Sequence, residues 1–300
     1  MLPNARGKLS DSRGKLVGTG TSFGGPSFQY EISNLTGTPS NSTPGANFTY
    51  GGGNVDGAAV SVITLTQSIQ YLVIGVAGCG TNAEDNSALA DILVDPAGGT
   101  SWTTLIDDLV VGFTGGLANG TGPMPLWYHF PLFVASGSSL GIRAKKNGAT
   151  AATSGYCVMF GFGNPSNQRA WDYGTGVESL GIADAANSKA TSITPGNTGA
   201  WSSYATIGTS TRQYRAIQLG LNGSDSAASN SGYHYQIGIG GTQIAGTPTF
   251  YGSIATSETL ARTQFYGPTY CNIPSGSAIQ LRATCSGAAE AQNVAIYGVY

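Results

Sequence analysis

The segment with the most recognisable chemical motif in this chain is residues 137–141, which read Gly-Ser-Ser-Leu-Gly. They match the G-x-S-x-G pattern of the hydrolase nucleophile elbow, which holds its serine on a sharp turn between a strand and a helix. Here the turn leads into alternating apolar and polar residues, the pattern of a strand. A related segment later in the chain has Gln280 in place of the last glycine. We therefore predict that no serine of this motif is catalytic.

The two histidines, His129 and His234, form no recognisable catalytic or metal-binding pattern. Each stands among aromatic residues, and the two do not occupy equivalent places in the repeated segments described below. A catalytic triad needs a nucleophile, a base and an orienting acid, and a catalytic zinc site needs three protein ligands. Hydrogen-bonded strand residues are the expected role, and we predict no catalytic residue, no metal and no cofactor.

Acidic residues are concentrated in one part of the first half of the chain. Six of the 15 carboxylates lie there: Glu84, Asp85, Asp91, Asp95, Asp107 and Asp108. Grouped oxygen donors suit Ca²⁺, and paired carboxylates suit glycoside hydrolysis. No EF-hand spacing is present, and we expect a solvated loop. Calcium binding by residues 84–108 is left open by the sequence.

Several aromatic residues lie in or beside expected loops and form a candidate carbohydrate-binding platform. They are Trp102, Trp171, Tyr173, Trp201, Tyr233 and Tyr235. Aromatic rings can stack on the apolar faces of sugar rings while nearby amides bind the hydroxyls. The alternative is that these side chains fill the core or a protein interface, as large aromatic residues often do.

The elements that must position these residues belong to a repeated unit. Residues 136–144 read SGSSLGIRA and return at 275–283 as SGSAIQLRA, with five of the nine positions identical. Each copy predicts a tight Ser-Gly turn followed by a strand whose apolar residues share one face. Because a slip of one residue would turn Arg143 or Arg282 into the core, the preserved phase implies a preserved fold.

Short predicted strands recur along the chain, separated by Gly, Asn and Pro turns and with almost no helical periodicity. This pattern predicts an all-β fold of two tandem antiparallel β-sandwich domains, jelly-roll-like and derived from an internal duplication. The expected boundaries are an extended N-terminal arm at 1–50, repeat one at 51–163, a connector at 164–193 and repeat two at 194–300. We expect one short helix within the connector, at 180–190.

Composition points to a surface of hydroxyl, amide and backbone groups rather than charges. Charged residues make up 9% of the 300 residues, glycine accounts for 46, and the net charge is −2. Extracellular adhesins, fibres and particle shells commonly have such surfaces, because large contacts then form without desolvating ions. The chain has no basic run and no long apolar run, so we expect neither a nucleic-acid partner nor a membrane partner.

The N-terminus and the cysteines both indicate production in a reducing cytosol. The first residues contain no apolar signal-peptide segment. Cys79, Cys157, Cys271 and Cys285 do not occupy equivalent positions in the two repeats, so we expect free, mostly buried thiols. The composition suits a protein that works outside the cell, yet the sequence shows no signal for export. Both observations fit a protein that is assembled in the cytosol and released by lysis.

Residues 265–283, FYGPTYCNIPSGSAIQLRA, resemble surface proteins of tailed-bacteriophage virions. Residues 131–144, PLFVASGSSLGIRA, contain the same motif in repeat one, with Ala135 at the position of Pro274. In those proteins, jelly-roll domains decorate the capsid, the collar or the fibres. The resemblance covers about forty residues per repeat and marks a turn and a strand. It implies a virion component and carries over no catalytic or binding residues.

The function expected from these observations is that of a non-enzymatic structural protein on the surface of a bacteriophage virion. It would decorate the capsid or form part of the collar or a fibre, with its N-terminal arm anchored on other virion proteins. A homo-oligomer is expected, assembled in the host cytoplasm. Two alternatives remain open: a carbohydrate-binding adhesin of the virion that recognises a host surface glycan, and a double-jelly-roll major capsid protein.

Overall fold

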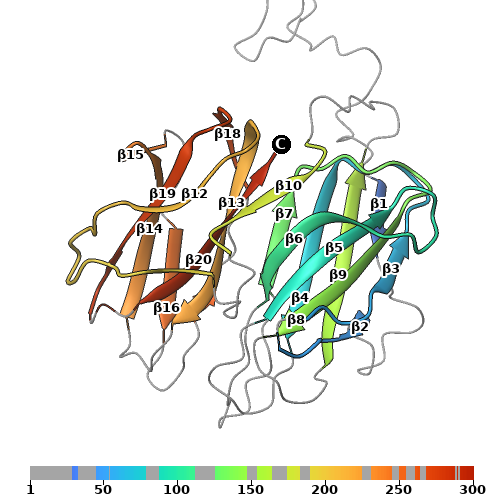
Figure 1. Cartoon of the computed structure of the whole chain (residues 1–300), viewed down its shortest axis with the longest axis horizontal. Coiled ribbons are helices and arrows are strands. Elements are labelled where there is room, and N and C mark those ends of the chain that lie inside the picture. The colour runs from blue at the N-terminus through green and yellow to red at the C-terminus, as the bar shows by residue number, and fades with distance from the viewer. Residues whose placement is uncertain are drawn as a thin grey trace, which may run out of the picture.

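Every regular element that the structure describes is a β-strand (Figure 1). This computed structural model describes residues 29–32, 45–53, 55–78, 88–111, 126–146, 154–163, 174–182, 190–224, 231–244, 250–254, 261–263, 268–287, 289 and 291–300. The all-β prediction is confirmed. In these residues no helix is long and apolar enough to cross a membrane.

The first sandwich, roll one, consists of eight strands divided between two sheets. The strands are β2 (Ala46–Thr49), β3 (Val60–Thr64), β4 (Tyr71–Gly78), β5 (Ala88–Asp95), β6 (Thr103–Val111), β7 (Leu126–Phe130), β8 (Ser139–Lys146) and β9 (Ser154–Gly163). One sheet has the order β2-β9-β4-β7 and the other β3-β8-β5-β6. Consecutive strands cross between the sheets in the manner of a jelly roll, which confirms the predicted sandwich type.

The second sandwich, roll two, repeats this strand order. Its strands are β11 (Thr191–Ile193), β12 (Ala205–Thr209), β13 (Tyr214–Ser224), β14 (Ser231–Ile239), β16 (Phe250–Ile254), β18 (Thr269–Ile273), β19 (Ala278–Cys285) and β20 (Gln292–Val299). They form the sheets β11-β20-β13-β18 and β12-β19-β14-β16. Two short strands are added to the second sheet, β15 (Thr242–Gln243) on β14 and β17 (Ala261–Thr263) on β16.

The Ser-Gly turns that define the sequence repeat have the same geometry in both rolls. Gly137 and Gly276 have φ values of 85° and 84°, a left-handed conformation that glycine adopts without strain. The N–H of Gly137 donates to Leu65 O at 2.9 Å, and that of Gly276 donates to Ser210 O at 2.7 Å. An internal duplication would produce such matches, and it remains our interpretation of the sequence repeat.

Strand pairing differs from the predicted boundaries at the arm and the connector. Within the arm, β1 (Gln29–Ile32) pairs with β9 and adds a ninth strand to roll one, and β2, already counted in roll one, pairs with another part of β9. Within the connector, β10 (Val177–Leu180) and β11 both pair with β20 in roll two. The helix expected at 180–190 begins in a strand, and residues 183–189 lie outside the described part. These strands are three or four residues long, too short to show a strand pattern in sequence.

The two rolls share one nine-stranded sheet. Its main order is β18-β13-β20-β10-β6-β5-β8-β3, and β10 joins the halves by pairing antiparallel with β20 and parallel with β6. In Figure 1, β13 and β20 lie between the outer sheet of roll two and strands β6 and β7 of roll one. All eight residues of β20 are buried, since Ile296 packs in the core of roll two and Tyr297 in the core of roll one.

Candidate functional site

The serines of the G-x-S-x-G match are buried within a sandwich. Ser138 and Ser139 are each 1% exposed, and the Ser139 hydroxyl lies 2.9 Å from that of Thr64 on the neighbouring strand. The turn leads into β8, as predicted, rather than into a helix. This geometry differs from an elbow, in which the nucleophile is presented to substrate.

The two histidines lie in different sheets. His129, in β7, is half-buried, and burial lowers the pKa of its imidazole. Its backbone N–H donates to Gln218 Oε1 of roll two at 2.8 Å. His234, in β14, is exposed and lies between two buried tyrosines. Both are strand residues, as the sequence predicted.

The predicted carbohydrate platform is not assembled as expected. Tyr233 and Tyr235 lie within β14 and are completely buried in the core of roll two, which contradicts their assignment to an exposed platform. The physical reason is strand alternation, because residues two apart point to the same side and the apolar rings take the inner one. Trp171 and Tyr173 lie outside the described residues.

Trp102 and Trp201 are half-buried and lie in different rolls. Trp102 covers Gly141, where an added Cβ would lie 3.0 Å from its ring. The guanidinium carbon of Arg282 lies 5.0 Å from the Trp201 ring centroid and 4.7 Å from that of Tyr204, which is a cation–π arrangement. Arg282 therefore covers one face of the Trp201 ring that a sugar would otherwise use.

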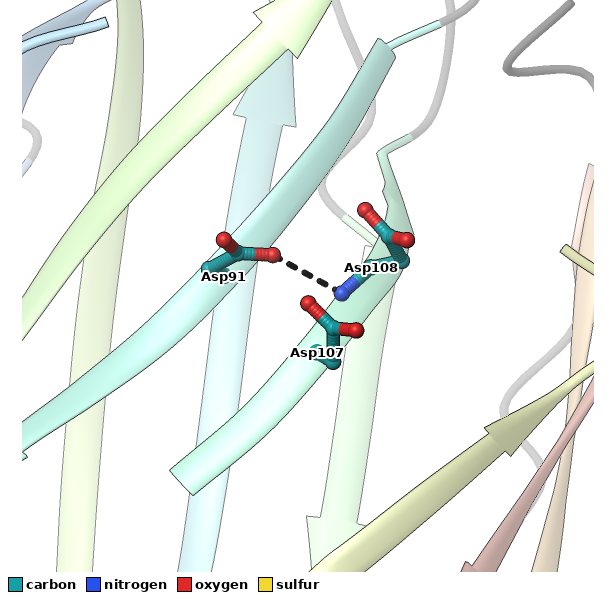
Figure 2. Close-up of side chains that lie close together, drawn as sticks. All are labelled: Asp91, Asp107 and Asp108. Atoms are coloured by element: carbon teal, nitrogen blue, oxygen red, sulfur yellow. Dashed lines mark hydrogen bonds between the residues drawn. The ribbon is translucent and has the colours of Figure 1, made fainter. Parts of the chain in front are cut away.

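The acidic stretch does form a cluster, but its main members are not on a solvated loop. Figure 2 shows Asp91, Asp107 and Asp108 on the adjacent strands β5 and β6, with carboxylate oxygens within 4.8 Å of one another. Asp91 and Asp108 are 3% and 5% exposed, so the solvated-loop prediction is wrong for them. Asp95 is also buried, and its carboxylate accepts the N–H groups of Ala97 and Ser101 in the following turn. Glu84 and Asp85 lie outside the described residues.

A β-bulge brings the three carboxylates together. Ala90 pairs with Leu109 and Ile92 with Ile106, so Asp107 and Asp108 both lie opposite Asp91. Asp108 has a φ of 52°, and its N–H donates to Asp91 Oδ1 at 2.9 Å. The Asp91 carboxylate thus satisfies a backbone group that the bulge removes from the ladder.

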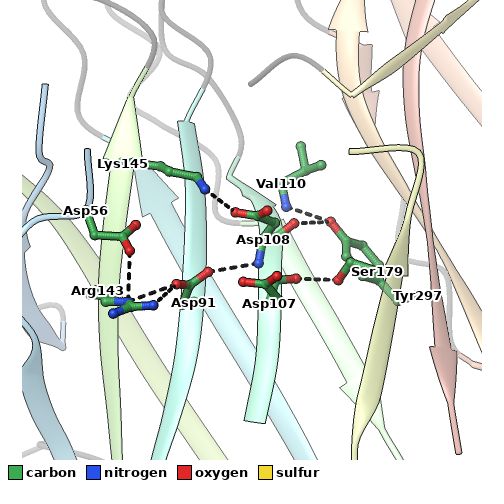
Figure 3. Close-up of polar contacts among 9 residues, drawn as sticks. All are labelled: Asp56, Asp91, Asp107, Asp108, Val110, Arg143, Lys145, Ser179 and Tyr297. Carbon is green, nitrogen blue, oxygen red and sulfur yellow. Dashed lines mark hydrogen bonds and ion pairs between the residues drawn. The ribbon is translucent and has the colours of Figure 1, made fainter. Parts of the chain in front are cut away.

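Two cations of the chain neutralise part of this cluster (Figure 3). Arg143 Nη2 lies 2.8 Å from Asp91 Oδ2, and its Nε lies 3.2 Å from Asp56 Oδ2. Lys145 Nζ lies 2.9 Å from Asp108 Oδ1, and both of these side chains are at most 9% exposed. The carboxylate oxygens that would bind a metal ion are therefore already paired with protein cations at Asp91 and Asp108. The arrangement is that of a buried charge network.

The matching position in roll two carries no charge pair. Arg143 pairs with Asp91 across β8 and β5, and Arg282 pairs with Gln236 across β19 and β14. Gln236 Oε1 accepts hydrogen bonds from Arg282 Nε at 2.9 Å and Nη2 at 2.7 Å. The arginine geometry is thus shared, whereas the cluster of carboxylates belongs to roll one in the described part of the chain.

Asp107 gives the network a pH dependence. The Asp107 side chain reaches the surface, but partial burial of its carboxyl group and the neighbouring carboxylates of Asp108 and Asp91 raise its pKa from 3.8 to about 7. Between these values the folded protein holds a proton at Asp107 that the unfolded chain has lost, so the contribution of Asp107 to stability falls as the pH rises from about 4 to about 7. We expect urea unfolding to show this fall, reduced by solvent screening because the side chain is exposed, and Asp107→Asn to remove it. An equal pH dependence in the variant would contradict the assignment.

The network borders a junction at which roll two satisfies backbone groups of the edge strand β7 and of the part of β6 that lies beyond its pairing with β10 at Ile106. The hydroxyl of Tyr297 accepts the N–H of Val110 at 2.7 Å and donates to Asp108 O at 3.1 Å, both on β6. Gln218 Oε1 accepts the N–H of His129, and its Nε2 lies 3.5 Å from Trp127 O, both on β7. Gln218 and Tyr297 face each other across β13 and β20. Tyr297 thus binds backbone groups of one sheet of roll one and Gln218 those of the other, as a neighbouring strand would.

Sequence reasoning missed these two junction residues, although one signal pointed to them. The closing strand reads Val-Ala-Ile-Tyr-Gly-Val without polar alternation, which is typical of a strand covered on both faces. The free thiols were predicted correctly where they are described. Cys157 and Cys285 are buried, Cys271 is half-buried, and none forms a disulfide.

No protein-family model and no curated protein matches this chain. Among solved structures it is similar to PNGF-II, with 10% identity, a TM-score of 0.35, and coverage of 91% of this chain and 65% of that chain. It is also similar to a chain from the atomic structure of Sulfolobus Turreted Icosahedral Virus, with 10% identity, a TM-score of 0.33, and coverage of 91% and 90%. At these TM-scores neither similarity carries an argument about function.

Proposed function

We propose that this chain is a non-enzymatic structural protein on the surface of a virus particle, a tailed bacteriophage by the resemblance of its Ser-Gly segments. The observation that carries the proposal is the joining of two jelly rolls with one strand order through a shared nine-stranded sheet. Jelly rolls occur in viral capsid domains as well as in lectins and cupins. A shell or surface lattice needs rigid blocks, and a shared sheet makes two sandwiches into one block.

Other features of the chain support this assignment. Its charged residues are few, so large contacts between neighbours would desolvate few ions. Arg143 and Lys145 are already paired with Asp91 and Asp108 within roll one, which gives these charges a structural role. Attachment to other virion proteins is proposed for residues 1–28, because the rest of the expected arm contains β1 and β2 of roll one.

A particle-binding experiment tests the proposal. Virus particles from the source of this chain would be treated with nuclease, banded in a density gradient and analysed by quantitative mass spectrometry. We expect the chain to band with the particles in a fixed copy number and to be digested by protease added from outside. Recovery of the chain only from the soluble fraction of the lysate would contradict the proposal.

One alternative is favoured by the same shared sheet, namely that the chain forms the shell itself as a double-jelly-roll major capsid protein. The copy number separates the two assignments. A shell protein would be the most abundant protein of the particle, whereas a decoration, collar or fibre protein would be outnumbered by another protein. Particles that stay intact after the chain is removed would exclude the shell assignment.

A further inference from the structure

We infer that the outer face of the sheet formed by β1, β2, β9, β4 and β7 is an interface at which two copies of this chain pack against each other. The residues that carry the inference point away from the core of roll one: Tyr71, Trp127, Tyr156, Val158, Phe160 and Phe162. Their alternating neighbours on β9, Cys157 and Met159, are buried in the core. All six outer side chains are partly exposed.

The matching face of roll two already serves as an interface between sandwiches. Tyr71 and Tyr214 each begin their strand after a glutamine, so β4 and β13 can be aligned residue by residue. The register of roll one pairs Gly75 with Val158, and that of roll two pairs Gln218 with Tyr297. The positions at which Gln218 and Tyr297 contact roll one therefore correspond to Gly75 and Val158 on the outer face of β4 and β9.

The outer face of β4 and β9 in roll one differs in chemistry from the matching face of β13 and β20 in roll two, and this difference indicates what kind of surface it can bind. Gln218 and Tyr297 supply hydrogen bonds to strand edges, whereas Gly75 and Val158 supply none. At Gly75 the ring of Trp127 covers the backbone, since an added Cβ would lie 2.7 Å from that ring. The Trp127 and Phe160 rings lie 6.0 Å apart on this face. An apolar face of this kind fits another apolar sheet face rather than an open strand edge.

A second copy of the chain supplies such a face. The six outer residues carry no formal charge, and burial lowers the pKa of His129, which lies against Tyr71 on the same face. The face therefore meets its own copy without charge repulsion at neutral pH. Its rim on β2 is formed by the exposed Asn47 and Thr49, which are polar and uncharged. The face also runs up to the junction between the rolls, because His129 next to Tyr71 bonds to Gln218. Packing of one face on itself gives a closed two-fold dimer, the commonest homo-oligomer.

Light scattering of matched lysine variants tests the inference. The wild-type protein is expected at twice 30.5 kDa. Val158→Lys should raise the dimer dissociation constant at least about tenfold, because a charge would be buried without a partner. Val55→Lys is the control, since Val55 is 66% exposed and lies outside this face. A wild-type monomer at every concentration, or an unchanged mass in Val158→Lys, would overturn the inference.

Oxidative footprinting of the wild-type protein gives an answer even if Val158→Lys fails to fold. Trp127 and Phe160 should become more reactive on dilution to the monomer, while Trp102, which packs over Gly141 of β8 in the other sheet, should not change. Equal changes at Trp102 and Trp127 would contradict the inference. The result is separable from the proposed function, because a dimer can form whether or not the chain bands with particles.

Discussion

Tyr297→Ala is expected to lower the free energy of unfolding by about 3–5 kcal/mol, the range for loss of a large buried aromatic side chain. The ring is completely buried and packs edge-on against Tyr128 at 5.5 Å in the core of roll one. The variant would also leave Val110 N–H and Asp108 O without their shared partner. Urea unfolding followed by circular dichroism measures the change.

Two further variants separate the parts of this effect. Tyr297→Phe keeps the ring and removes the hydroxyl, so we expect a loss of about 1–3 kcal/mol from the polar groups that the hydroxyl satisfies. Tyr270→Phe is the surface control, because Tyr270 is 67% exposed, and a change within about 0.5 kcal/mol is expected. If Tyr297→Phe were as stable as the wild type, the hydroxyl would not serve the junction as described.

Lys145→Met is expected to destabilise the protein by about 3–5 kcal/mol. The substitution keeps an unbranched side chain but leaves the buried Asp108 carboxylate without its cation, at the bulge beside Asp107. Removing one partner of a buried pair costs more than the pair contributes, because the remaining charge stays buried without its counter-ion. The unfolding free energy at neutral pH measures this loss.

A double variant provides the control for this prediction. In Lys145→Met with Asp108→Asn both charges are absent, so we expect the protein to recover most of the stability lost in the single variant. A double variant less stable than Lys145→Met would mean that Asp108 stabilises the bulge through its charge rather than depending on Lys145.

The parts of the fold that follow from local pattern could be predicted from the sequence. The Ser-Gly turns need a left-handed glycine, and the strands after them bury Leu140 and Ile142 as their alternation indicates. The recurrence of short strands between Gly, Asn and Pro turns predicts the two sandwiches in the same way. Tyr233 and Tyr235 could have been placed correctly too, because their spacing of two residues around His234 is itself a strand signal.

The junction could not be predicted in the same way, because its contacts join residues far apart in the chain. Tyr297 bonds to residues 187 and 189 positions away, and no local pattern encodes that pairing. The acidic network could not be predicted for the same reason. The bulge in β6 and Lys145 on β8 come together only when the sheet forms. The strands β1 and β10 are four residues long, too short for their sequences to show which strands they pair with, namely β9 and β20.

Electron cryo-microscopy of virus particles from the source of this chain tests the central claim most directly, namely that two joined jelly rolls form one rigid building block of the particle. The account predicts paired jelly rolls in the density, with β6 and β7 of roll one against the outer face of β13 and β20. Particles without such density, or density in which the two sandwiches of one chain lie apart, would contradict it.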